Sequence, residues 1–199
     1  MKRLKMFVPA VRLSVICLVV TLLLAGTNEL TREKIAVQVE AASLVQKQII
    51  FPEGVDFSII TLDPAILKTL DTKGISVKEL SEAKDAGGNV IGYVFVSESF
   101  GYAGNVVATT GINMEGQIVM VRATAANDTP NLGKRVEENA FLSQFSGLGT
   151  DTPTSVTEGK DIVKIDGISG ATISSRAAST AVNKAIDTYT YLLEEGVIS

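Results

Sequence analysis

The distribution of apolar residues separates an N-terminal membrane-compatible stretch from a region of mixed polarity. Residues 13–26, LSVICLVVTLLLAG, carry no charge, and MFVPAV before Arg12 extends the stretch to about 21 residues, enough to cross a bilayer core. Four cations precede the main run: Lys2, Arg3, Lys5 and Arg12. By the positive-inside rule, we expect residues 1–27 to form a cytoplasmic N-terminus and a single transmembrane anchor. The remainder of the chain would then be extracytoplasmic.

A cleaved signal peptide is the alternative interpretation of this stretch. The apolar run is long for a signal peptide, and Ala25-Gly26-Thr27 is a poor cleavage site. Both interpretations place the rest of the chain outside the cytoplasm.

Beyond the anchor, the pattern first predicts a helix. Residues 28–51 carry apolar side chains near helical spacing, and Pro52-Glu53-Gly54 ends this segment. We therefore expect a connecting helix over 28–52 and a globular domain over 53–199. Residues 58–70 and 75–84 show only weak periodicity.

The domain sequence then alternates between apolar and polar residues. This alternation predicts three antiparallel strands, at residues 89–99, 101–113 and 116–126. Asn113-Met114-Glu115-Gly116 provides a hairpin turn between the last two strands. Next come a Gly/Pro-containing loop (127–134), a short helix near 136–145, a polar stretch (147–161) and a short strand, IVKID.

A long C-terminal helix is predicted from Ser174 toward Glu194. Its buried face consists of small and branched residues at helical spacing: Ala177, Ala178, Ala181, Val182, Ala185 and Ile186. Helices arranged around an antiparallel sheet define an α+β fold.

The composition excludes several classes of function. The chain has no histidine and one cysteine, Cys17, so a Ser-His nucleophile pair, imidazole-ligated metals and zinc-thiolate sites are excluded. The net charge is −4, and without the four N-terminal cations 14 Lys and Arg stand against 22 Asp and Glu. Because such a surface repels phosphate backbones, we expect no nucleic-acid partner.

The candidate chemistry lies in DGISGATISS, residues 166–175. Gly167 and Gly170 allow successive N–H groups to point into one concavity, and Ser174 or Ser175 could cap the following helix. A phosphate suits such a helix N-terminus. Ser169 and Thr172 supply hydroxyls that could accept a covalent group. The alternative is a turn and a helix cap without a ligand; a P-loop lysine is absent.

The segment resembles the flavinylation signature Asp-Gly-x-Ser/Thr-Gly-Ala-Thr. This signature occurs in the FMN-binding domains of the Rnf and Na⁺-pumping NADH:quinone reductase complexes. NELTREKIA (28–36), GYAGNV (101–106), NDTPNLG (127–133) and FLSQF (141–145) are similar to further stretches of the RnfG family, in the same order. Two positions depart from the family pattern: Ala126 stands where a histidine is common, and Asn131 replaces a glycine of the Thr-Pro loop.

The resemblance implies that FMN is joined through its phosphate to the hydroxyl of Thr172. It also implies that the Thr-Pro loop, including Asp128, lies beside the flavin. The further cofactor-binding residues that it implies are Asp166, Gly167, Ser169, Gly170, Ala171, Ile173, Thr129, Leu132, Gly133 and Tyr102. Two roles stay open: Tyr102 either stacks on the ring or belongs to the core, and Arg176 either faces the phosphate or forms a surface salt bridge.

The implied function is electron transfer in a membrane ion-translocating ferredoxin:NAD⁺ oxidoreductase complex. The chain would be an electron carrier there rather than a catalyst on its own, with iron–sulfur and flavin subunits as partners. A separate flavin transferase would attach FMN, taken from FAD, during maturation. The alternatives are the corresponding subunit of the Na⁺-pumping quinone reductase, a stand-alone anchored flavoprotein, and a non-redox binding module.

Overall fold

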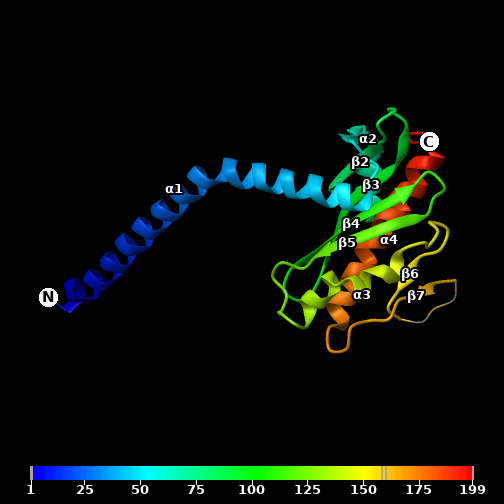
Figure 1. Ribbon diagram of the computed structural model, residues 1–199. Helices are drawn as coiled ribbons and strands as arrows, with labels where there is room; N and C mark the ends of the chain where they lie inside the picture. Colours follow the sequence, from blue (N-terminus) through cyan, green and yellow to red (C-terminus); the bar gives the residue numbers. More distant parts are fainter. Residues whose placement is uncertain (1, 158, 160, 199) are drawn as a thin grey trace. The chain divides into compact units, whose positions relative to one another are not determined.

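The computed structural model describes residues 2–157, 159 and 161–198, which fall into two compact units divided between Ser43 and Leu44 (Figure 1). The first unit is purely helical and belongs to helix α1, Lys2–Ile50. The predicted anchor and connecting helix are therefore parts of one continuous helix. The side chains of Lys2, Arg3 and Lys5 lie outside the described set.

Within α1, the 24 residues Pro9–Arg32 are long and apolar enough to cross a membrane, with a mean hydropathy of 2.2 over an 18-residue window. By length and composition it is the one such helix among the described residues. Its large apolar side chains are exposed; those of Leu22, Leu23 and Leu24 are each more than 60% accessible. Three successive helical residues point to different sides of the helix, so the apolar surface is not confined to one face. Such a surface suits a lipid environment better than a one-sided protein contact.

The second unit is built on a five-stranded antiparallel sheet in the order β1-β2-β3-β4-β5. The three predicted strands correspond to β3 (Val90–Phe100), β4 (Asn105–Asn113) and β5 (Ile118–Thr124). The predicted turn is present, and Gly116 has φ 72°, a left-handed conformation that glycine adopts without strain. The structure adds β1 (Asp56–Ile59) and β2 (Glu79–Lys84), which the sequence pattern did not reveal.

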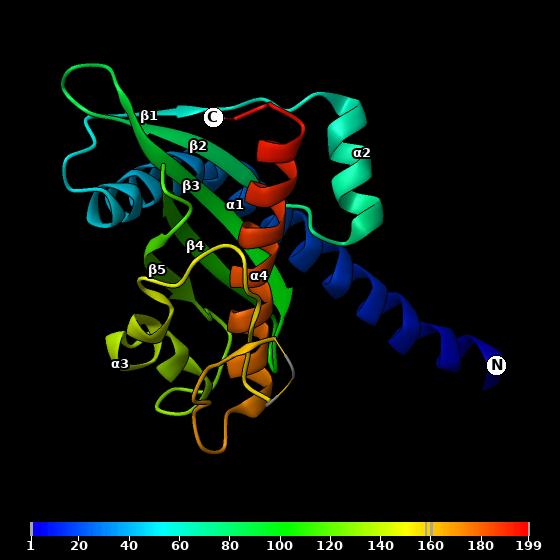
Figure 2. The same cartoon turned by 90° about the vertical axis from the view of Figure 1, so that its right-hand side faces the viewer.

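Helix α4, Thr172–Glu194, covers one face of this sheet, and Figure 2 shows it crossing in front of the strands. The predicted small-residue face is buried against β3 and β4, and it allows close approach: Ser97 Oγ donates a hydrogen bond to Ala181 O at 2.6 Å. Phe95 and Tyr189 pack edge to face with ring centroids 6.2 Å apart. The main hydrophobic core therefore lies between α4 and the sheet.

The last turns of α1 cover the opposite face of the same sheet. Ile50 and Phe51 form a second, smaller core with Ala83 and Val94. Buried Lys47 donates to Glu79 Oε1 at 2.5 Å and to Ser81 Oγ at 2.9 Å, so β2 is also tied to this helix. The compact unit consequently begins at Leu44, earlier than the boundary expected at residue 53.

Short elements complete the second unit. Helix α2 (Pro64–Lys73) begins after the Asp63 cap, and β6 (Thr154–Ser155) pairs with β7 (Val163–Lys164) in parallel. The single helix expected near 136–145 is instead three pieces: η1 (Gly133–Glu137), α3 (Asn139–Leu142) and η2 (Ser143–Phe145). With this layout the structure confirms the α+β fold, an antiparallel sheet with a long C-terminal helix.

Candidate functional site

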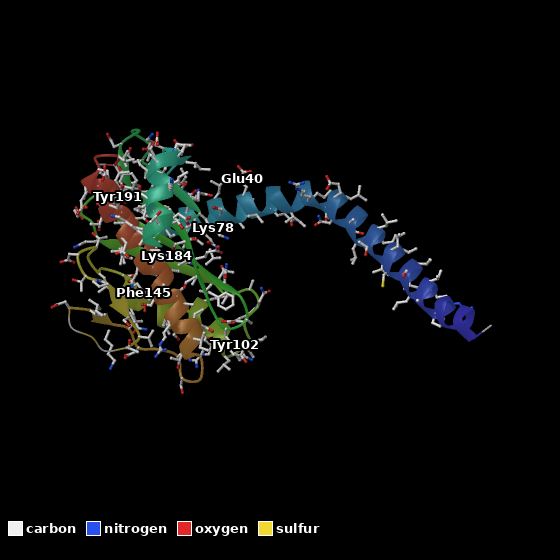
Figure 3. The ribbon with its side chains drawn as sticks, turned by 180° about the vertical axis from the view of Figure 1, so that it is seen from behind. Glu40, Lys78, Tyr102, Phe145, Lys184 and Tyr191 are labelled. Atoms are coloured by element: carbon white, nitrogen blue, oxygen red, sulfur yellow. The ribbon has the colours of Figure 1, made fainter. Side chains whose placement is uncertain are left out.

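A cavity of about 420 Å³ opens where three separate segments meet. They are the turn between β3 and β4, the Thr-Pro loop after β5, and the first turn of α4. Figure 3 shows Tyr102 at the end of the domain where α4 begins. The residues lining the cavity are Tyr102, Thr129, Leu132, Gly133, Gly170, Ala171, Thr172, Ile173 and Ser174.

Eight of the eleven residues assigned to the flavin from sequence therefore line one cavity. The other three, Asp166, Gly167 and Ser169, line a neighbouring hollow of about 450 Å³ together with Arg135 and Glu138. The signature thus divides between two hollows, with its Asp-Gly-x-Ser half in one and its Gly-Ala-Thr half in the other.

Thr172 is the first residue of α4, and its side chain is exposed at the cavity. Ala171 occupies the N-cap position and provides no side-chain cap. The expectation that Ser174 or Ser175 caps the helix is therefore wrong, because the helix begins two residues earlier and both serines are buried inside it. The first-turn N–H groups of α4 thus have no side-chain cap, which is the arrangement that binds anions.

Ser175 has a different local role. Its Oγ donates to Ala171 O and accepts from Ile168 N, each at 3.0 Å, and its side chain is fully buried. These two bonds join the signature loop to the first turn of α4. Gly170 within the loop has φ 78°, which explains the need for glycine there.

Gln144 was missed by the sequence analysis and fixes the other end of the signature loop. Its Oε1 accepts from Asp166 N at 2.7 Å, and its Nε2 donates to Asp166 O at 3.2 Å. One side chain thus satisfies both backbone groups of Asp166 in the way that a neighbouring strand would. Its place in FLSQF, between buried Leu142 and Phe145, gave no signal of this contact.

The Thr-Pro loop forms the opposite wall of the cavity. Its turn is closed by Thr129 O, which accepts from Leu132 N and Lys134 N, each at 3.2 Å. Asn131 has φ 59°, so asparagine adopts the left-handed conformation at the position where the family pattern has glycine. Asp128 is 4% exposed, and its Oδ1 accepts from Ala103 N at 3.0 Å. Asp128 therefore joins the Thr-Pro loop to the turn that carries Tyr102.

The structure places the two residues whose roles were open, Tyr102 and Arg176, in different surroundings. Tyr102 is 68% exposed at the cavity and so does not belong to the core. Arg176 lines a separate hollow of about 310 Å³ beside β6, away from the lining of the Thr172 cavity.

The cavity lining combines apolar side chains with hydroxyl groups. No carboxylate, lysine or arginine is among its described residues, so a group able to activate the Thr172 hydroxyl is not at hand. Tyr102, Leu132 and Ile173 present apolar surface at 68%, 40% and 53% exposure. A planar apolar ring together with an anionic group would match this combination of surfaces.

Comparisons with known proteins agree with this description. Residues 101–187 match the FMN-binding domain, and residues 1–45 match the RnfG N-terminal region. The chain is 30% identical to the G subunit of the Na⁺-translocating ferredoxin:NAD⁺ oxidoreductase complex of Acetobacterium woodii, over 89% of this chain and 88% of that protein. It is 32% identical to the G subunit of the ion-translocating oxidoreductase complex of Methanosarcina acetivorans, over 89% and 90%.

A solved structure shares the fold. It is the C subunit of the Na⁺-translocating NADH-quinone reductase from Parabacteroides distasonis, with a TM-score of 0.53 over 70% of this chain and 78% of that one. At 16% identity, this likeness concerns the fold alone.

The family match and the candidate membrane helix, together with this fold, thus define a membrane protein of the FMN-binding domain class. More narrowly, the chain belongs to the RnfG family, the G subunits of ion-translocating oxidoreductase complexes.

Proposed function

We propose that this chain carries FMN, covalently bound to Thr172, as an electron-transfer subunit of a membrane ion-translocating ferredoxin:NAD⁺ oxidoreductase complex. Membership of the RnfG family supports the complex. The related protein from Acetobacterium woodii is named as a subunit of a Na⁺-translocating ferredoxin:NAD⁺ oxidoreductase complex, and that from Methanosarcina acetivorans as a subunit of an ion-translocating oxidoreductase complex. The other subunits of the complex, including iron–sulfur and flavin subunits, are the proposed partners.

The observation that carries the proposal is the position of Thr172. Its exposed hydroxyl lies at the first residue of α4, on the wall of a cavity that the Thr-Pro loop and Tyr102 also line. The uncapped N–H groups and the positive end of the helix dipole would hold a phosphate there. Tyr102, Leu132 and Ile173 would cover the ring and shield it from water.

When bound, FMN supplies the ability to take up and release one or two electrons. The chain contributes position and electrostatics. Ser175 and Gln144 hold the two ends of the signature loop, so Thr172 is presented at a fixed place. Gly170 provides the left-handed turn directly before the helix.

Attachment requires a second protein. In the proposed step, Thr172 Oγ1 forms a bond to the FMN phosphorus of FAD, the pyrophosphate bond breaks, AMP leaves, and the hydroxyl proton passes to a base. The described cavity lining contains no such base. A separate flavin transferase would therefore catalyse the step, and this chain would be its acceptor substrate.

The experiment expresses the full chain with a flavin transferase and measures intact mass and in-gel fluorescence. The wild-type chain should carry one FMN, and Thr172→Ala should carry none. Because the Thr172 side chain is exposed and α4 also tolerates alanine, Thr172→Ala should stay folded, with a stability change within about 1 kcal/mol. Ser169→Ala is the matched control, since Ser169 lines the neighbouring hollow and should keep the flavin.

Thr172→Ser should retain partial attachment, because serine keeps the nucleophile and loses only the methyl group that restricts χ1. Full attachment to Thr172→Ala would refute the proposed linkage. A wild-type chain that never retains fluorescence on a denaturing gel would instead favour the non-redox binding module.

We also propose that the N-terminus is cytoplasmic and the second unit extracytoplasmic. Protease added to intact spheroplasts should then digest the region after residue 32, the end of the candidate span. Full protection of this region would reverse the proposed orientation.

A further inference from the structure

Asp128 is the buried carboxylate that stands out among the described residues. It is 4% exposed, and its Oδ2 has no hydrogen-bond partner, whereas its Oδ1 accepts from Ala103 N at 3.0 Å. None of the salt bridges of the described residues includes it. A buried charge with one unpartnered oxygen is costly to the folded state.

The loop contact alone does not explain this arrangement. An asparagine would also accept from Ala103 N through its side-chain oxygen, and it would do so without a buried charge. The hydrogen bond to Ala103 N by itself therefore does not require a carboxylate at position 128.

The neighbours of Asp128 all belong to the cavity wall or adjoin it. Ala103 follows Tyr102, and Thr129 follows Asp128 itself. A Cβ atom on Gly133 would lie 2.6 Å from Asp128 Oδ2 and 2.7 Å from its Cγ. The carboxylate thus sits directly behind the backbone of Gly133, which lines the cavity. Any side chain at position 133 would require the Asp128 carboxylate to shift.

We infer that Asp128 is an electrostatic and positioning residue that holds the two loops of the cavity together and lowers the reduction potential of the flavin bound there. The inference rests on the proposed function. A fixed negative charge in a weakly polarisable interior acts strongly at short range. Two-electron reduction with uptake of one proton from solvent leaves the flavin ring with one additional negative charge, so the fixed charge of Asp128 disfavours the reduced form.

The test uses the full chain, flavinylated by co-expression with a flavin transferase, and a redox titration followed by absorbance. Asp128→Asn keeps the shape and the Ala103 contact while removing the charge. We expect its midpoint potential to rise, with an approximately tenfold larger reduced-to-oxidised ratio at a fixed ambient potential, about 30 mV for a two-electron couple.

Glu137→Gln is the matched control. Glu137 also accepts from a backbone amide of this region, Ala125 N at 2.6 Å, but its neighbours in the chain do not line the cavity, whereas Asp128 precedes Thr129 and lies behind Gly133. The same loss of one charge should leave the reduced-to-oxidised ratio at that ambient potential within a few-fold of the wild-type value. An equal shift in both variants would overturn the inference, because the effect would then reflect net charge rather than the place of Asp128.

Two further outcomes bear on the inference. An unchanged potential in Asp128→Asn would overturn it while leaving the proposed function intact, because the flavin would still be attached. Should Asp128→Asn not fold, Asp128→Ser removes the charge with a smaller side chain and must raise the potential in the same direction. Failure of the proposed function is recognised separately, by a wild-type chain without flavin.

Discussion

Gly111 provides a sharp test of how the end of α1 joins the FMN-binding domain. It lies in β4, and a Cβ built on it would be 2.1 Å from Ile50 Cγ2 and 3.0 Å from a ring carbon of Phe51. Ile50 is 1% exposed and Phe51 6%, so neither side chain has free space to move into. Gly111→Ala should therefore force the helix end away from the sheet.

The expected magnitude follows from two opposing effects. Overpacking of a close-packed core costs about 1–3 kcal/mol, and the lower entropy of the unfolded alanine chain offsets about 0.4–1 kcal/mol of that. At roughly 2–4 °C per kcal/mol for a chain of this size, the melting temperature should fall by several degrees. The measurement is thermal unfolding of the full chain in detergent, followed by near-ultraviolet circular dichroism.

A double-mutant cycle separates this contact from a general loss of stability. Ile50→Ala alone should cost about 2–5 kcal/mol, because it leaves a cavity. In the double variant the new Cβ occupies part of that space, so the combined cost should be smaller than the sum by roughly 0.5–3 kcal/mol. Gly26→Ala is the control, since its Cβ would meet nothing within 4 Å. A neutral Gly111→Ala, or additive effects, would refute the packing of α1 on the sheet.

Three further predictions concern the site and its surroundings. Ser175→Ala leaves the Ile168 amide without its partner, so it should lower the free energy of unfolding by about 1–3 kcal/mol and slow FMN attachment to Thr172. A time course of intact mass measures the attachment rate, and an unchanged rate would contradict the positioning role of Ser175. Gly133→Val should change the flavin absorbance without abolishing attachment, because the valine side chain would collide with Asp128 rather than with the signature loop. An identical spectrum would mean that the Thr-Pro loop does not shape the ring site. Hydrogen bonds from Lys78 first, and then from Asn105, hold the pKa of Glu98 below its ordinary value. Glu98 therefore stabilises the fold at pH values above its ordinary pKa, and this stabilisation is lost as the pH falls through the lowered pKa. Glu98→Gln should accordingly lose up to about 1 kcal/mol at neutral pH and show no deficit in strong acid, as followed by urea unfolding at several pH values; a deficit that persists in acid would contradict the assigned cause.

The sequence by itself determined the elements whose signals are local. The uncharged run within Pro9–Arg32, the alternation in β3, β4 and β5, and the small-residue face of α4 each follow from residues close together in the chain. The stretches at 101–106, 127–134 and 166–175 are also continuous in the chain, so the eight residues found together at the cavity could be named before any coordinates.

Tertiary structure decided what depends on contacts between distant segments. Strand β2 buries Ser81 and Ala83, which carry little hydrophobic signal, and it forms because β1 and β3 supply its hydrogen bonds. Lys47 looks like a surface residue in the sequence and is buried because Glu79 and Ser81, more than thirty residues away, satisfy its ammonium group. The start of α4 at Thr172 is set by Ser175, whose side chain reaches back to Ile168 and Ala171.

The same reason explains the division of the signature and the place of Asp128. Asp166, Gly167 and Ser169 face a different hollow from Thr172 because Gln144 holds the Asp166 backbone from a segment more than twenty residues earlier. Asp128 lies behind the cavity wall because its partner amide belongs to Ala103, on another turn of the sheet. Sequence spacing carries no information on such pairings, since burial and hydrogen bonding at these sites exist only after the chain has closed around them.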